Sequence, residues 1–516
     1  MNLNHINVIA RYEVKLVKRS WLFRIFAILA LLFISAIMLG YQTGIVNRMD
    51  NLWPRIAVSS LMPFCNTYFY NIAQSVIVVF LAGSFLKRDK KLDTAEVIYV
   101  RPMSNADYIV GKTWGIVKVF ITLNIITLLF TAFLNILINK SPFDLFPYLF
   151  YLLTISVPSL LFVLGLSFTA MCILKNQAVT FIVMLGIIGT VFFYLTDTLY
   201  GVFDFFGVNI PAIFSDVTGH ADLRLFLLQR FSYLLAGIGL ISMTIALVKR
   251  LPHKPWKIAV VYTFSSLFLL AACLGGLLYI LHYNHQLDLR HQYIMTFDKY
   301  ADVPHVDLLV NDISVTPQGH RLAGKSTVKV ANNNAKPLDK IIFYLNPELT
   351  VTSVEMAGKN LPFRRDHQVI EVDQPIQQQE ELTLTINYEG KISENICYTD
   401  VLTEDYLDTK VPQVFWRFGK RYAWLSNTFT LLTPECIWYP VTIAPVNPGA
   451  PYNVRKNFTD YTLTVHYEGD KTVLSQGKSK IDGSVITFTN TSALPGISLT
   501  IADYDKKALR VDSTDY

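Results

Sequence analysis

The stretch IAVVYTFSSLFLLAACLGGLLYIL at Ile258–Leu281 decides the architecture of this chain. It carries no charge and is long enough to cross a bilayer as one helix, which takes roughly 20 apolar residues. Six similar stretches precede it, and a polar region follows it. A seventh crossing places everything after it on the side of the membrane opposite to the N-terminus. The two halves of the chain therefore have to be considered separately.

The composition agrees with a membrane-embedded first half. The chain has 516 residues, of which 52% are hydrophobic and 16% charged, whereas soluble domains have about 25% charged residues. The first apolar stretch, Trp21–Tyr41, is long and is not followed by a small-residue cleavage site, which excludes a cleavable signal peptide. The other predicted spans are Trp21–Tyr41, Leu61–Leu86, Thr113–Ile138, Tyr148–Leu174, Val179–Leu199 and Phe226–Val248.

The basic residues predict the orientation of the spans. Lys and Arg concentrate in loops on the cytoplasmic side of membranes. With a cytoplasmic N-terminus, the clusters at 87–91 and 249–257 lie inside, and the opposite loops hold only Arg48, Arg55, Lys140 and Arg224. We therefore predict a multi-pass protein of the inner (cytoplasmic) membrane with a periplasmic or extracellular C-terminal domain. This bias accounts for the net charge of +6, so no nucleic-acid partner is expected.

Residues 4–20 and the loop between spans two and three are the two most informative cytoplasmic segments. The first alternates apolar and basic residues at helical spacing, which predicts an amphipathic helix on the cytoplasmic leaflet; a charged flank that only orients the first span is the alternative. In the loop, Asp93 and Glu96 have the spacing of a capping box and Pro102 would end a helix. A short helix is expected there, either as a partner surface or as a simple positive anchor.

The same loop resembles that of the permease subunits of ABC-2 type ATP-driven transporters. The residues that carry the resemblance are Arg88-Asp89, Asp93-Thr94-Ala95-Glu96, Pro102 and Gly111-Lys112. The resemblance implies a six-span permease core over residues 1–250, and a short re-entrant segment, rather than an eighth span, within Thr196–Leu225. It also implies a loop that docks into a separate cytoplasmic ATPase subunit through Arg88, Asp93, Thr94, Glu96, Arg101, Pro102, Gly111 and Lys112.

The permease resemblance implies an exporter powered by its partner. ATP and magnesium would be bound by the ATPase subunit, with no cofactor in this chain, and a second permease copy, identical or related, would complete the path. The spans themselves carry almost no charge, which argues against coupling to an ion. Their amides at Asn71, Gln74, Asn124 and Asn135 are expected to join helices by hydrogen bonds.

A seventh-span segment is assigned to 251–285 and an all-β domain to 286–516, because from about Asp302 apolar and polar residues alternate as half-buried strands require. The expected strands are Ser326–Ala331, Lys340–Leu345, Leu382–Asn387, Tyr461–His466 and Ile497–Ala502. The overall fold class is therefore a membrane all-α half followed by an extracytoplasmic all-β half. The segment Gly319–Ser326 matches a phosphate-binding loop, but a strand pattern follows it where that loop requires a helix. A hairpin is the better interpretation.

The β domain resembles the N-terminal domain of the aminopeptidase N-like gluzincins over about residues 300–516. The resemblance rests on the order of Phe415-Trp416, Thr433–Pro440, Val473–Gly477 and Asp503-Tyr504. A zinc peptidase of this kind needs His-Glu-x-x-His, which the sequence lacks, so we expect no metal site and no enzymatic activity. The alternative function is therefore a membrane-anchored, aminopeptidase-related protein, a fragment or inactive, whose outer domain binds peptides or partners.

Two of the five cysteines, Cys397 and Cys436, fall in the outer domain. In an oxidising compartment they could form a disulfide, and two buried free thiols are the alternative. No cysteine spacing matches a zinc site.

Overall fold

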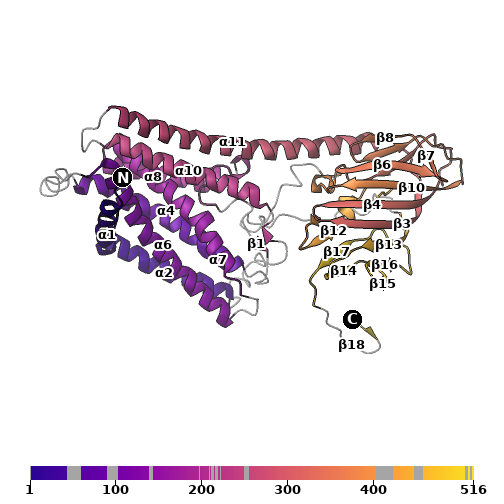
Figure 1. Ribbon diagram of the computed structural model, residues 1–516, viewed down its shortest axis with the longest axis horizontal. Coiled ribbons are helices and arrows are strands. Elements are labelled where there is room, and N and C mark those ends of the chain that lie inside the picture. The colour runs from indigo at the N-terminus through magenta and orange to yellow at the C-terminus, as the bar shows by residue number, and fades with distance from the viewer. Residues whose placement is uncertain are drawn as a thin grey trace. The chain divides into compact units, whose positions relative to one another are not determined.

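The computed structural model divides the chain at Tyr283–Asn284 into a helical unit and a β unit, which are described separately (Figure 1). The residues described are 2–42, 60–89, 103–138, 143–196, 198–207, 210, 214–215, 219–220, 222–248, 255–401, 422–446, 457–505, 510–511 and 514–515.

Among these residues, seven helical segments of the helical unit are long and apolar enough to cross a membrane. They agree with the seven predicted spans, although several helices extend beyond them. The elements in order are α1 (Leu3–Arg19), α2 (Trp21–Gln42), α4 (Leu61–Asp89), α6 (Asn105–Ile138), α7 (Phe146–Tyr151), η1 (Leu152–Ser156), α8 (Val157–Leu174), α9 (Gln177–Thr190), η2 (Val191–Leu195), η3 (Thr198–Gly201), β1 (Phe214–Ser215), β2 (Gly219–His220), α10 (Leu223–Leu247) and α11 (Pro255–Tyr300).

The fourth span contains a π-helical turn, η1, between α7 and α8. Pro158 follows it and cannot donate a backbone hydrogen bond, so the preceding turn widens instead of breaking. The widened turn places Ser156 and the first turn of α8 towards neighbouring helices, where both Ser156 and Ser159 are buried.

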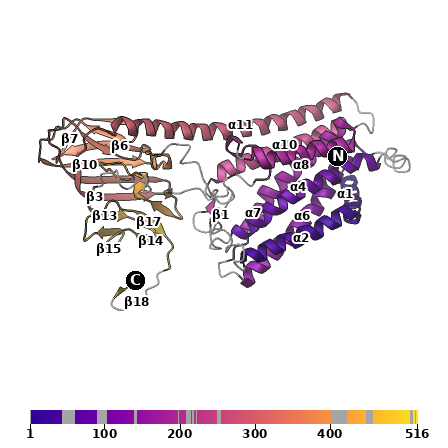
Figure 2. The same ribbon diagram turned by 180° about the vertical axis from the view of Figure 1, so that it is seen from behind.

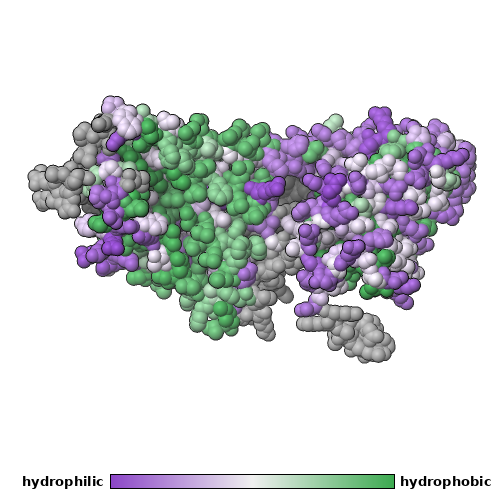
Figure 3. Space-filling view, in the orientation of Figure 1, coloured by the Kyte–Doolittle hydropathy of each residue, from purple (hydrophilic) through white to green (hydrophobic). Residues whose placement is uncertain are grey.

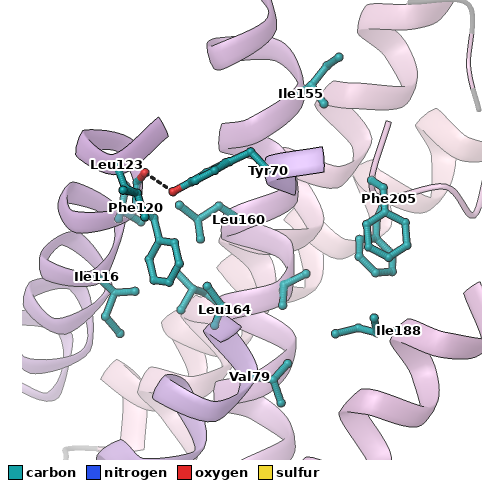
Figure 4. Packing of buried hydrophobic residues seen from close by; sticks show 14 of the residues in the cluster. Tyr70, Val79, Ile116, Phe120, Leu123, Ile155, Leu160, Leu164, Ile188 and Phe205 are labelled. Carbon is teal, nitrogen blue, oxygen red and sulfur yellow. Dashed lines mark hydrogen bonds between the residues drawn. The ribbon is translucent and has the colours of Figure 1, made fainter. Parts of the chain in front are cut away.

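The core of the helical unit consists of aromatic and branched side chains from α4, α6, α8 and α9. In Figure 4, Tyr70 of α4 lies beside Phe120 of α6, and its hydroxyl donates a 2.6 Å hydrogen bond to the Phe120 carbonyl. Leu160 and Leu164 of α8 pack into the same cluster. Figure 3 shows hydrophobic residues over much of the visible face of the helical unit, as expected for a surface in contact with lipid.

Helices α8 and α10 approach closely through two glycines. A Cβ atom at Gly165 would lie 2.8 Å from the Gly237 carbonyl oxygen, and one at Gly237 would lie 2.7 Å from the backbone at Leu161. Thr169 hydrogen-bonds Thr244 across the same contact at 3.1 Å. Small residues at such crossings are typical of helix pairs in membranes, because close packing replaces the hydrophobic effect there.

The segment between α9 and α10 is not an eighth span in its described part. Residues 198–207 form a 3-10 turn and a tight loop whose Gly201, Asp204, Phe205 and Phe206 are buried. The loop packs into the helical unit, as the prediction of a short re-entrant segment requires.

The β unit contains an eight-stranded sheet of order β15-β16-β13-β3-β4-β10-β6-β7, a four-stranded sheet (β11-β12-β17-β14) and a three-stranded sheet (β5-β9-β8) (Figure 2). The strands are β3 (Asp307–Gln318), β4 (Arg321–Ala331), β5 (Ile341–Tyr344), β6 (Leu349–Met356), β7 (Lys359–Asn360), β8 (Phe363–Asp366), β9 (Val369–Val372), β10 (Glu381–Gly390), β11 (Ala423–Leu425), β12 (Thr430–Leu432), β13 (Asp460–His466), β14 (Thr472–Leu474), β15 (Lys478–Asp482), β16 (Val485–Thr489), β17 (Leu499–Ala502), β18 (Arg510–Val511) and β19 (Thr514–Asp515).

The five predicted strands are confirmed as β4, β5, β10, β13 and β17. Helix α11 continues to Tyr300, beyond the seventh-span segment at 251–285, and the strands begin after it with β3. The phosphate-loop match lies in the β3–β4 hairpin, where Gln318 pairs with Arg321 and Gly319 has a φ of +60°. The segment is a turn between strands, as the hairpin interpretation predicted.

We expect Gly237→Ala to lower the thermal stability of the purified chain, because the added methyl would meet the α8 backbone and force α8 and α10 apart. Overpacking of this kind costs about 1–3 kcal/mol. Gly186→Ala in α9 is the matched control, since nothing lies within 4 Å of its Cβ position. Equal unfolding temperatures for the two variants in one detergent would contradict the close crossing.

Candidate functional site

The residues predicted to couple the chain to an ATPase fall into three groups. Arg88 lies in the last turn of α4, and Asp93, Thr94, Glu96, Arg101 and Pro102 lie outside the described residues. Gly111 and Lys112 lie within α6 rather than in a loop. Their proposed contact with an ATPase stays a prediction, and the structure gives Gly111 and Lys112 a further role in packing.

That role is to hold α1 against the start of α6. A Cβ at Gly111 would lie 2.8 Å from Ile9 Cβ, and one at Gly115 would lie 2.7 Å from Glu13 Cβ. Between these two contacts, Lys112 Nζ donates a 3.0 Å hydrogen bond to Glu13 Oε2, and both side chains are buried. Helix α1 therefore packs one face against α6. The sequence predicted that α1 is amphipathic but gave no indication of this partner.

The most unusual side chain of the helical unit is Arg230 of α10, which is 1% exposed. Its Nη2 donates a 2.6 Å hydrogen bond to the Asp204 carbonyl oxygen, and its Nη1 donates one of 3.1 Å to the Phe205 carbonyl oxygen. Gln229 donates to the carbonyl oxygens of Gly201 and Asp204, both at 3.0 Å. Two adjacent residues of α10 thus satisfy the backbone of the inserted loop.

The Asp204 carboxylate completes this arrangement from within the loop. Its Oδ1 accepts hydrogen bonds from the backbone N–H groups of Phe206 and Gly207 at 3.0 and 3.1 Å, which closes a tight turn. Gly207 has a φ of +72°, and a Cβ there would lie 2.5 Å from Arg230 Nη1. Glycine is required at this position both by the backbone conformation and by the guanidinium beside it.

A chain of buried polar groups connects this loop with α4, α6 and the π-helical turn. Asn71 Nδ2 donates to the Phe206 carbonyl oxygen at 2.5 Å and to Ser159 Oγ at 2.9 Å. Asn124 Nδ2 donates to Ser156 Oγ at 2.7 Å, and Gln74 donates to Asn71 Oδ1. The predicted role of these amides as hydrogen-bonding links between helices is confirmed.

The sequence interpretation missed Arg230, because it treated the spans as almost uncharged. The available signal was its position, four residues inside the predicted sixth span at Phe226–Val248. An ionisable residue at membrane depth indicates a functional or structural site by default.

We expect Arg230→Met to destabilise the chain strongly, since it removes the donors that satisfy the Asp204 and Phe205 carbonyl oxygens. Each hydrogen bond to a charged group contributes about 1.5–3 kcal/mol. The measurement is the unfolding temperature in detergent, with Arg224→Met as control, because Arg224 is exposed on the same helix. If both variants unfold alike, Arg230 does not hold the loop.

In the β unit, Arg290 of α11 is buried and donates to four backbone carbonyl oxygens. Its Nη1 bonds those of Asn395 and Cys397 at 3.1 and 2.8 Å, and its Nη2 bonds those of Tyr398 and Val401 at 3.0 and 3.1 Å. A single side chain thereby orders the segment that contains Cys397.

Cys397 and Cys436 are both buried free thiols in this structure. Burial raises the pKa of each thiol well above its ordinary value, and the Cys436 Sγ donates to the Thr433 carbonyl oxygen at 3.0 Å. Asn346 joins the two segments, because its Nδ2 donates to the carbonyl oxygens of Ser393 and Cys436 at 2.9 and 2.7 Å. A disulfide between these cysteines stays a prediction.

A shallow groove of about 260 Å³ lies on the eight-stranded sheet. Lys325 of β4 and Glu389 of β10 supply opposite charges to it, and Ser314 Oγ hydrogen-bonds His466 Nε2 at 3.0 Å. Asn387 also lines the groove and donates to Ser353 Oγ at 2.8 Å. Within the described residues, no three His, Cys, Asp or Glu side chains are grouped so as to hold a metal ion.

Two carboxylates connect the end of α11 to the strands of the β unit. Asp366 accepts a 2.5 Å ion pair from Lys299, and this partner holds its pKa below the ordinary value. Glu371 accepts a hydrogen bond from the Tyr300 hydroxyl and a 2.9 Å ion pair from Lys340, and these partners hold its pKa low as well, Tyr300 contributing most.

Because the folded pKa values are lowered, these carboxylates stabilise the β unit above their unfolded pKa values, about 3.9 and 4.3. That stability is lost as pH falls through the folded values. We expect unfolding temperatures to fall between about pH 5 and pH 3, and less steeply in Asp366→Asn/Glu371→Gln than in the parent. Asp460→Asn, at an exposed position, should leave the slope unchanged; an unchanged slope in the double variant would contradict this assignment.

Comparisons with known proteins give matches among solved structures only. No family model and no curated protein matches the chain. The M1 zinc metallopeptidase from Deinococcus radiodurans matches at 14% identity and a TM-score of 0.29, over 41% of this chain and 46% of that one. A mutant of it bound to a Tyr-Ser-Ala substrate matches at 16% identity and 0.30, with the same coverage.

A third match, a two-domain M1 zinc metallopeptidase mutant bound to L-arginine, has 16% identity and a TM-score of 0.29, over 40% of this chain and 44% of that one. The chain thus spans less than half of each of these structures. The ABC-2 resemblance rests on the six-span core and the loop residues.

These neighbours also correct the prediction that the chain is not an enzyme, since they are zinc metallopeptidases. The described residues form a helical unit with seven candidate membrane spans and a β-rich unit.

Proposed function

We propose that this chain is a membrane-anchored, aminopeptidase-related protein whose β unit binds peptides or peptide segments of partner proteins. The observation that carries this proposal is the groove on the eight-stranded sheet. It presents a cation at Lys325, a carboxylate at Glu389 and an amide at Asn387 within one surface. Peptides combine charged termini with hydrogen-bonding amides, so these three groups match the chemistry of a short extended peptide.

The test is peptide binding by the full chain in detergent. Binding of a labelled tripeptide library is measured by fluorescence polarisation. We expect Lys325→Gln and Glu389→Gln each to weaken binding about tenfold, which corresponds to the loss of one charge-assisted hydrogen bond. Lys480→Gln, exposed on β15 of the same sheet, should bind as the parent does. Equal binding by all variants would exclude the groove as the peptide site.

A second candidate function is that of the permease subunit of an ABC-2 type exporter. The specific observation in its favour is the interior of the helical unit, where buried amides, Arg230 and the inserted loop form a hydrogen-bonded structure across α4, α6, α8 and α10. An anchor needs one or two spans and no such interior. In this function a cytoplasmic ATPase subunit binds ATP and magnesium, and a second permease copy completes the path.

Glu96→Arg is the direct test of the second candidate. Reversing this charge should abolish co-purification of the ATPase subunit, or uncouple its ATP hydrolysis from transport, if the loop docks as the resemblance implies. Glu468→Arg, an equal charge change at an exposed position of the β unit, should have no effect. Transport and co-purification that survive Glu96→Arg would count against the permease function.

A further inference from the structure

Helix α1 separates its charges between two faces. The inner face, formed by Ile6, Ala10, Glu13 and Val17, is buried. Glu13 is the only acidic residue of the helix, and its carboxylate pairs inward with Lys112 at 3.0 Å. The exposed side chains with charge are therefore all cationic, namely Arg11, Lys15, Lys18 and Arg19.

Apolar and aromatic side chains lie among these cations. Leu3, Val8 and Tyr12 of α1 are more than half exposed, and Trp21 at the start of α2 is 74% exposed. Helix α2 continues with the exposed residues Leu22, Ile25 and Ile28, which form an apolar surface of the kind that faces lipid tails. The basic face of α1 is thus continuous with a lipid-facing surface.

Tryptophan–lysine pairs mark headgroup depth elsewhere in the helical unit. Lys118 Nζ lies 4.9 Å from the Trp114 ring centroid on α6, and Lys257 Nζ lies 5.7 Å from that of Trp256 on α11. Figures 1 and 2 both show the beginning of α11 at the same end of the helical unit as α1. Exposed tryptophan rings and basic side chains are enriched where a helix meets the headgroup layer.

From these observations we infer that the outer face of α1 is a binding surface for the headgroups of anionic phospholipids. The four cations, with no exposed acid on the same helix, favour a negatively charged ligand. The apolar side chains between them favour a bilayer surface over a soluble acidic protein as that ligand. The ion pair with Lys112 is essential to this selectivity, because it removes the single carboxylate that would repel the headgroups. The surface does not depend on either proposed function.

The experiment is native mass spectrometry of the full chain in detergent, titrated with phosphatidylglycerol or with phosphatidylcholine. The parent should bind phosphatidylglycerol several times more tightly. Each cation near an anionic surface changes binding roughly fivefold, so Arg11→Gln/Lys15→Gln/Lys18→Gln/Arg19→Gln should lose most of that preference. The double variant Arg11→Gln/Lys15→Gln should lose part of it, and Arg11→Lys/Lys15→Arg should retain it.

The matched control neutralises four exposed lysines of the β unit, Lys336, Lys391, Lys478 and Lys480, and should keep the full preference. Soluble glycerophosphoglycerol should not compete at millimolar concentration, because the apolar contacts require a lipid. A parent chain that binds both lipids equally, or a quadruple α1 variant that retains the preference, would overturn the inference. The inference would also be overturned if the quadruple α1 variant lost a co-purifying acidic protein while its lipid binding stayed unchanged.

Discussion

The burial of the Arg230 guanidinium is the constraint on which the helical unit depends. A cation at membrane depth is tolerated only where its donors are satisfied, and here backbone carbonyl oxygens from one loop accept them. The dependence is mutual, because non-helical backbone within a membrane also needs partners. Neither the loop nor the arginine could be buried without the other, and Gly207 fits between them because it has no side chain.

In the β unit, too, a buried arginine donates hydrogen bonds to backbone carbonyl oxygens of an irregular segment. Arg290 supplies donors to four carbonyl oxygens of a segment that belongs to no strand. The guanidinium has five donors in a rigid plane, so one side chain can order several residues of irregular chain. In both units, therefore, the regular elements follow from hydrophobic patterning, whereas the irregular segments next to them depend on one buried cation.

The sequence predicts the regular elements well, because each has a local signal. Runs of apolar residues predicted the spans, and alternation predicted β4, β5, β10, β13 and β17. The extension of α11 to Tyr300 has no comparable signal, because polar residues interrupt the apolar run after Leu281 and no regular pattern replaces it. The partners of Arg230 and of Glu13 lie far away in sequence, so the geometry of the candidate sites could not be predicted, only their chemistry.

The ion pair between Glu13 and Lys112 has a consequence for biosynthesis. Its members are 99 residues apart, and chains elongate at roughly 5–20 residues per second. The carboxylate of α1 therefore waits on the order of 5–20 s for its partner to leave the ribosome. During that interval α1 carries an unpaired charge on the face that is later buried against α6. Helix α1 therefore reaches its final position only after α6 has been synthesised.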